Sequence, residues 1–282
     1  MQTFLLRAGA GYMYNGFRRG MKNMTILFVF AVCLAASVIG GICGIGGGVL
    51  IKPVLDALGV MSVSAVSLLS GLTVLSMAVI NVYKSRKSSE LDAKRSLPLG
   101  VGAAVGGVMG KQLFETVKQA AGNDSLVGAI QAIVLGLMVA ATLAYVLNKK
   151  RIRTKNVRSS AAGAGIGFAL GLCSSFLGIG GGPMNLAVLY YFYSMSTKQA
   201  AINSLLIILV SQIASLMMSV VKGNIPAFDP LMLVVMVAAG IMGGNVAAKL
   251  RKSLSTETTD KLFSALLVVI ILICCYNLVI RI

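Results

Sequence analysis

Long runs of apolar residues, separated by short polar and basic stretches, dominate the chain. A helix needs about 20 apolar residues to cross a hydrocarbon core of about 30 Å. Uncharged runs of about that length are Thr25–Cys43, Val60–Tyr83, Leu126–Leu147, Ser159–Pro183, Ala200–Val221, Leu231–Ala248 and Leu262–Ile280. Leu97–Gly110 is shorter, and Val49–Leu58 and Met184–Tyr193 are each about half a span. Because the runs are continuously apolar rather than alternating, they predict an all-α, polytopic bundle of about eight to ten membrane helices.

Composition supports the same class. Hydrophobic residues make up 57% of the chain and charged residues only 12%, whereas soluble domains carry about 25% charged residues. Too little polar surface remains to face water. We therefore expect a multi-pass integral membrane protein, with a bacterial plasma membrane as the expected location.

The net charge of +17 is concentrated between the apolar runs. The basic clusters are Lys84–Arg95, Lys149–Arg158 and Lys249–Lys261. Such clusters in short loops are typical of the positive-inside rule, and their nearest partners are anionic membrane lipids. Because no basic and aromatic motif accompanies the charge, the sequence does not predict nucleic-acid binding.

The sequence argues against catalytic chemistry and metal sites. It contains no histidine, and its five cysteines lie within apolar segments at spacings typical of neither a zinc site nor a disulfide framework. Gly107–Gln112 falls short of an ATP-binding phosphate loop. We therefore predict no enzyme, no metal and no cofactor.

A glycine motif occurs twice. Gly44–Gly48 and Gly178–Gly182 both read GIGGG, at an offset of 134, and a second pair of matching segments, Gly107–Gly110 and Gly240–Gly243, has an offset of 133. These matches predict two tandem homologous repeats. Their predicted bounds are a basic juxtamembrane segment at 1–24, a first repeat at 25–147, a basic linker at 148–159 and a second repeat at 160–282.

Loop charge bears on the relative orientation of the repeats. The more basic loop comes earlier in the first unit and later in the second, which favours an inverted arrangement. Inversion requires an odd number of crossings per unit, so each half-length piece would have to count as a crossing, and it places the basic N-terminus on the wrong side. A parallel arrangement of four plus four spans instead places the basic loop Lys249–Lys261 outside. Inversion is slightly favoured, and both arrangements remain open.

The two glycine runs are the strongest candidates for a binding site. Consecutive glycines weaken a helix and release backbone groups, which is tolerated at membrane depth only inside protein or along a cavity. Amides at the start of the following half-helix can bind an anion. Paired interruptions in two halves of a transporter point to a substrate site near the membrane midplane. The alternative is close helix packing through small residues.

Charged and small polar residues surround the predicted breaks. Lys52 and Asp56 are the only charges well inside an apolar stretch; Lys52 could add positive potential and Asp56 could carry a proton, or both could lie near an interface. The polar candidates could bind an oxyanion or bridge helices. They are Ser67, Ser70, Ser174, Ser175, Asn185, Asn203 and Ser204.

The GIGGG motif, a half-helix and a following A-x-x-S-L/A-I-N-S-L span, given twice, resemble the sulfite exporter TauE/SafE family, also called TSUP permeases. The resemblance implies transport of small sulfur-containing or organic anions such as sulfite, sulfonates or sulfoacetate. It places the glycine-rich breaks on Gly46, Gly47, Gly48, Gly180, Gly181 and Gly182. The proline after the break falls on Pro53, whereas Ala187 occupies that position in the second half and Pro183 follows the glycines directly, so the two half-sites are not equivalent.

These observations together predict a secondary transporter or facilitator of small, most plausibly sulfur-containing, anions that bind at the two breaks. The coupling ion (proton or sodium, or none), the direction of transport and the oligomeric state stay open. An anion channel and a non-catalytic membrane subunit of a larger complex are the alternatives.

Overall fold

The computed structural model describes residues 24–59, 61–121, 124–149, 151–176, 182–223 and 225–281. Within those ranges, the side chains at 56–58, 63–64, 114–115, 118–121, 124–132 and 277–281 lie outside the description. In the described part every regular element is an α-helix. The helices are Met24–Cys43 (helix 24–43), α2 (Gly48–Leu58), α3 (Val63–Ser85), α4 (Ala93–Ala121), α5 (Asp124–Asn148), α6 (Ser160–Phe176), α7 (Gly182–Tyr193), α8 (Thr197–Val221), α9 (Pro230–Ser253) and α10 (Thr256–Arg281).

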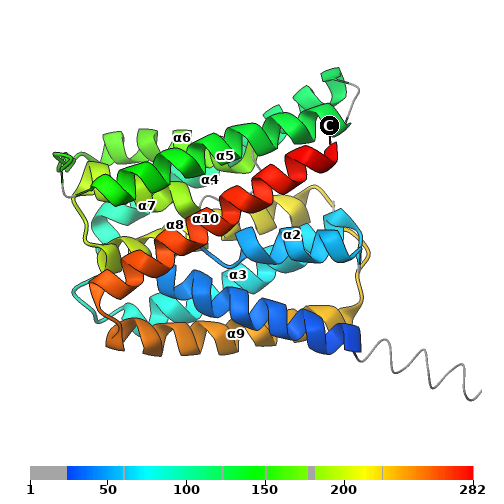
Figure 1. The fold of residues 1–282 in the computed structure, drawn as a ribbon, viewed down its shortest axis with the longest axis horizontal. Helices are drawn as coiled ribbons and strands as arrows, with labels where there is room; N and C mark the ends of the chain where they lie inside the picture. Colours follow the sequence, from blue (N-terminus) through cyan, green and yellow to red (C-terminus); the bar gives the residue numbers. More distant parts are fainter. Residues whose placement is uncertain are drawn as a thin grey trace, which may run out of the picture.

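The helices lie side by side along one common direction (Figure 1). Five have the length and apolar composition to cross a membrane: helix 24–43, most of α3 and α10, and all of α8 and α9. This confirms the multi-pass, all-α class. One predicted bound was too short: the 29-residue α4 extends well beyond Leu97–Gly110 into charged residues at both ends. The run Ser159–Pro183 contains α6 and the first two residues of α7, and its residues 177–181 lie outside the description.

Local capping sequences fix where several helices begin. Ser62 accepts a hydrogen bond from the Ala65 amide at the start of α3. Ser196 and Gln199 form a reciprocal capping box at the start of α8, and Asp229 caps α9 just before Pro230. These side chains replace backbone partners that the first turn of a helix lacks. The polar residues between the apolar runs therefore define the helix ends.

Glycines let α4 approach α6 closely, and the contacts give the relative direction of the two helices. A β-carbon at Gly102 would lie 2.1 Å from the Ala164 carbonyl oxygen, and one at Gly106 would lie 2.0 Å from that of Phe168. Residue numbers rise together along both helices, so they run parallel. α4 also runs parallel to α8, because Ser96 contacts Asn203 near the start of both helices.

A second group of parallel helices lies opposite the first. Gly243 of α9 packs on Leu34 and Ser37 of helix 24–43, and farther along Gly41 packs on Ala247. α3 runs parallel to α9, because Gly240 meets Thr73 and Gly244 meets Met77. α3 and α8 run in opposite directions, since Gly71 lies against Gln212 while Val74 and Ile208 both contact Gly46. Helix 24–43, α3 and α9 therefore run one way, and α4, α6 and α8 run the other.

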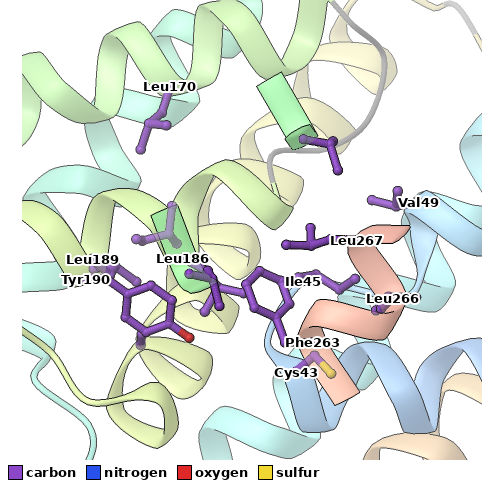
Figure 2. Packing of buried hydrophobic residues seen from close by; sticks show 14 of the residues in the cluster. Cys43, Ile45, Val49, Leu170, Leu186, Leu189, Tyr190, Phe263, Leu266 and Leu267 are labelled. Atoms are coloured by element: carbon purple, nitrogen blue, oxygen red, sulfur yellow. The ribbon is translucent and has the colours of Figure 1, made fainter. Parts of the chain in front are cut away.

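The buried apolar side chains form two main clusters. One joins helix 24–43, α2, α3 and α9. The other cluster contains side chains of α4, α5, α6, α7, α8 and α10, and also Ile45 and Val49 at the first glycine run. Figure 2 shows Ile45 close to Phe263 and Leu267 of α10. α4 packs most extensively on α6, and α9 on α3. α4, from the first half of the sequence, thus belongs to the cluster that contains most helices of the second half. α9, from the second half, belongs to the cluster of helix 24–43, α2 and α3.

Candidate functional site

The first glycine run ends one helix and starts another. The amides of Gly44 and Ile45 both donate to the Gly40 carbonyl, and the chain then turns through Gly44 at φ +78° and Gly46 at φ +71° before α2 begins at Gly48. Side chains are strained in this left-handed region, which glycine adopts freely. Glycine at positions 44 and 46 is therefore required by the backbone path itself.

This break lies at the middle of the bundle. Added side-chain atoms at Gly46 would touch Val74 and Ile208, each of which lies near the midpoint of its own helix, α3 and α8. These two helices have 23 and 25 residues, the length of a membrane crossing. The break therefore lies at the level where the midplane of a membrane crossed by these two helices would fall.

The second half-helix begins against the first break. A β-carbon at Gly182, the first residue of α7, would lie 1.9 Å from the Ile45 carbonyl oxygen. Gly180 and Gly181 lie outside the described residues, so of the second glycine run only Gly182 can be placed. The N-terminal ends of α2 and α7 thus meet, and both carry the positive end of a helix dipole.

Backbone amides at this point have unused hydrogen-bonding capacity. In the described part of the chain, the amides of Gly46, Gly47, Gly48 and Val49 have no backbone acceptor. Such amides at the start of a helix are the donors that bind carboxylates, sulfates and phosphates. Four amides at the first break are therefore free of backbone acceptors, and their role in anion binding stays a prediction.

The glycines of the first run nevertheless have different surroundings. Gly44, Gly46 and Gly47 are buried, and a β-carbon at Gly47 would lie 2.8 Å from the Ala36 carbonyl oxygen. Gly48 is half-buried, and its β-carbon would meet only a methyl of Val74 at 3.1 Å. The packing alternative therefore describes Gly47, while Gly48 keeps an accessible surface.

Lys52 lies on the same side of α2 as Gly48. Residues four apart share a helix face, at about 6 Å along the axis. Lys52 is half-buried and has no ion-pair partner among the described residues, whereas its neighbours Ile51 and Leu55, three residues or fewer away on α2, are fully buried. The side chain of Asp56 lies outside the description. Lys52 is therefore the one described cation close to the break on α2.

Several polar groups near the breaks are buried without partners. Among the described residues, the hydroxyls of Ser37, Ser174 and Ser204 have no hydrogen-bond partner, and the side chain of Asn185, which is 3% exposed, has none either. Ser37, which the sequence reasoning missed, contacts Gly47 through its backbone nitrogen. Buried polar groups are normally bonded, so unpaired ones indicate an unfilled site or a bound water or ion.

Other predicted side chains are used inside the protein. The Asn203 amide accepts from Asp92 N and Ser96 Oγ and donates to the carbonyls of Glu90 and Gln199, which fills all four of its positions. It anchors the α3–α4 connection to α8 and has no donor left for a substrate.

The remaining predicted serines also contact protein groups. Ser70 donates to the Ser67 carbonyl, and the Ser67 side chain is exposed. Ser175 Oγ faces Gly107 of α4. The described residues contain no group of three potential metal ligands.

The five apolar helices of membrane length define a multi-pass membrane protein. The family model for the sulfite exporter TauE/SafE matches residues 29–273, and the chain belongs to that family. It is also similar to the probable membrane transporter protein MamO of Magnetospirillum gryphiswaldense, with 25% identity over 87% of this chain and 44% of that protein. The chain therefore spans less than half the length of this relative. No solved structure matches the chain. The chain is therefore a multi-pass membrane protein of a transporter family, as the sequence indicated.

Proposed function

We propose that this transporter moves a small, sulfur-containing oxyanion and binds it where the N-terminal ends of α2 and α7 meet. The observation that carries the proposal is the meeting itself: Gly182 packs on Ile45 at the middle of the bundle, beside backbone amides without acceptors. Two helix dipoles then point their positive ends at one place. The sulfur-containing class comes from the family.

Lys52 and the buried hydroxyls complete the proposed site. Lys52 supplies the net positive charge one turn from Gly48, and the unpartnered hydroxyls of Ser37, Ser174 and Ser204 offer further donors. A group of neutral donors with a single cation suits an anion of low charge, because full neutralisation would hold it too tightly to release. Asn185, on the first turn of α7, contributes from the second half.

We further propose that the two halves are inverted repeats that alternate access to this site. The supporting observation is the order and direction of the helices. A half-helix occupies second place in each half, helix 24–43 and α6 run in opposite directions, and so do the pairs α3 and α8, and α4 and α9. α2 returns towards the end from which helix 24–43 came (Figure 1). The next three helices, α3, α4 and α5, then cross. The first half therefore has an odd number of crossings without the half-helix being counted as one.

Anion binding to purified protein tests the site. Sulfite, thiosulfate, sulfonates, sulfoacetate and short carboxylates are screened for an increase in melting temperature, because a ligand of the folded state raises it. Calorimetry with the best ligand then compares the wild type with Lys52→Gln. Loss of one charged contact is expected to weaken binding about tenfold or more, equivalent to about 1.4 kcal/mol.

Lys222→Gln is the matched control, since Lys222 is an exposed lysine at the far end of α8. It should bind the ligand like the wild type. Equal binding by wild type and Lys52→Gln would remove Lys52 from the site. Gly165→Val, at a helical glycine with open space around it, is the control for Gly48→Val. If both variants bound the ligand like the wild type, the break would not be the anion site.

A further inference from the structure

A second candidate site lies at the basic end of the bundle, and not at its middle. A cavity of about 370 Å³, which we call the Arg251 cavity, lies between the ends of α3 and α9 and the start of α8. Five cations and one carboxylate line it. They are Lys84, Lys87, Lys198, Arg251, Lys252 and Glu90. A water molecule in the liquid occupies about 30 Å³, so the space admits a hydrated oxyanion or a phosphate headgroup.

Arg251 is the unusual member of this set because it is only 3% exposed. Its Nη1 donates to the Gly41 carbonyl at 3.0 Å and to Asn81 Oδ1 at 3.1 Å, and its Nη2 donates to Ser85 Oγ at 2.9 Å. All three acceptors are neutral. A guanidinium has five N–H donors, so one donor on Nε and one on Nη2 remain unused.

No carboxylate of the described residues lies within ion-pair distance of Arg251. The partly buried Lys149 shows the usual solution, because its Nζ lies 2.5 Å from Asp260 Oδ2. Glu90 lines the same cavity and attracts Arg251 electrostatically, but without a direct ion pair. A buried charge without a directly bonded counter-ion is costly. The cost falls if an anion occupies the adjoining cavity, and the planar guanidinium presents its free donors in the geometry that oxyanions accept.

The surrounding lysines make the cavity strongly positive. Lys84, Lys87 and Lys252 are exposed and Lys198 is half-buried, so their chains can move onto a bound ligand. Five cations against Glu90 leave four positive charges unbalanced, which exceeds what a single monovalent anion compensates. An adjoining cavity of about 530 Å³ shares Lys84 and Lys252 and adds Lys249. The charge favours a multiply charged oxyanion.

Arg251 also connects this cavity to the first glycine run. The Gly41 carbonyl would normally accept from the Ile45 amide four residues later, but that amide donates to Gly40 instead. Arg251 takes its place and caps the broken end of helix 24–43 with a positive charge. A ligand on Arg251 therefore sits one hydrogen bond away from the break.

From these contacts we propose that the Arg251 cavity binds a multiply charged oxyanion of the sulfate or phosphate type, held by the free donors of Arg251 and by Lys84 and Lys252. The same chemistry fits a free anion entering from the basic end or the headgroup of an anionic lipid. This site is separate from the glycine breaks, and it does not depend on their binding a substrate.

Sulfate and inorganic phosphate are the probes for a free anion, titrated by calorimetry into the full-length protein in detergent. The double variant Lys84→Gln/Lys252→Gln leaves Arg251 and its cap intact, and we expect it to raise the Kd at least about tenfold. Lys222→Gln is expected to bind the probes like the wild type, and Lys52→Gln is titrated beside it to report any binding at the glycine break. Retention of phosphatidylglycerol, against phosphatidylcholine, in nanodiscs tests the lipid source.

Loss of sulfate or phosphate binding in the double variant alone supports the site with a free anion as its ligand. Loss of phosphatidylglycerol retention in the double variant, without free-anion binding in the wild type, supports it with a lipid as its ligand. Unchanged binding of both in the double variant overturns the proposal. Loss in Lys52→Gln alone also overturns it, and would assign the binding to the glycine break instead.

Discussion

Glycine is used in two different ways in this molecule, along the contact of α4 with α6 and at the break before α2. Along the first, most contact glycines face the backbone of the partner helix, as Gly106 faces the Phe168 carbonyl. At the break, Gly46 is needed for its positive φ, Gly47 for space, and Gly48 for neither, since only a side-chain methyl lies near it. The comparison shows that a glycine-rich sequence alone does not separate packing from binding. The nearest neighbour of each missing side chain does.

The largest effect is expected where two backbones touch. Gly106→Ala places a β-carbon about 2.0 Å from the Phe168 carbonyl oxygen, so α4 and α6 must separate. We expect a loss of at least about 3 kcal/mol, beyond the gain of about 1 kcal/mol that alanine brings to a helix. Thermal unfolding in detergent measures it. Gly165→Ala on α6, with open space around it, should cause no loss; a loss of the same size there would contradict the packing explanation.

The junction of the two half-helices should be the next most sensitive point. Gly182→Ala brings a β-carbon to 1.9 Å from the Ile45 carbonyl oxygen, so the two residues must separate. The three atoms nearest to this β-carbon all belong to Ile45. We expect a cost of about 2–3 kcal/mol together with loss of anion binding, measured by unfolding and calorimetry on the same preparation. Wild-type stability in this variant would mean that α7 can shift freely, and that the two breaks do not define a fixed site.

Backbone strain alone should have a smaller effect. Gly46→Ala keeps the packing, because its β-carbon would meet only the ends of Val74 and Ile208 at 3.2–3.3 Å, but it puts alanine at φ +71°. The expected cost is about 1–2 kcal/mol, again from thermal unfolding. Gly46→Asn should recover part of the loss, since asparagine tolerates this region better. Equal losses for both substitutions would point to crowding instead of strain.

The smallest change in stability is expected at Gly48. A β-carbon there meets only a methyl of Val74 at 3.1 Å, so Gly48→Ala should shift the free energy of unfolding by no more than about 0.5 kcal/mol. Anion affinity should nevertheless fall if the amides beside it bind the substrate. Calorimetry on Gly48→Ala therefore separates binding from folding, which Gly47→Val cannot do because its side chain would collide with the Ala36 carbonyl.

Much of the architecture could be predicted from the sequence because it depends on local patterns. Apolar runs gave the helices, and the GIGGG motif located a break that the path through Gly44 and Gly46 confirms. The repeat bounds and the anion site remain predictions. What the sequence could not predict depends on contacts between distant residues. The substrate role of Asn203 stays a prediction, but its side chain bonds the α3–α4 connection, which no local pattern indicated.

Arg251 was missed for the same reason. In the sequence it belongs to a basic loop, Lys249–Lys261, where charge normally indicates exposure. Its burial follows from the small residues of α9, Gly243 and Gly244, which bring the helix against helix 24–43 and α3 and carry the arginine inward. A helix with glycines on one face and an arginine two turns later was the available signal.

The placement of α4 and α9 has a consequence for how such a chain could be divided. α4 rests on α6 and α8, and α5 rests on α7 and α10, whereas α9 rests on α3 and helix 24–43. A fragment ending in the linker at 148–159 would therefore leave the glycine face of α4, and the sides of α5 that pack on α7 and α10, without their partners.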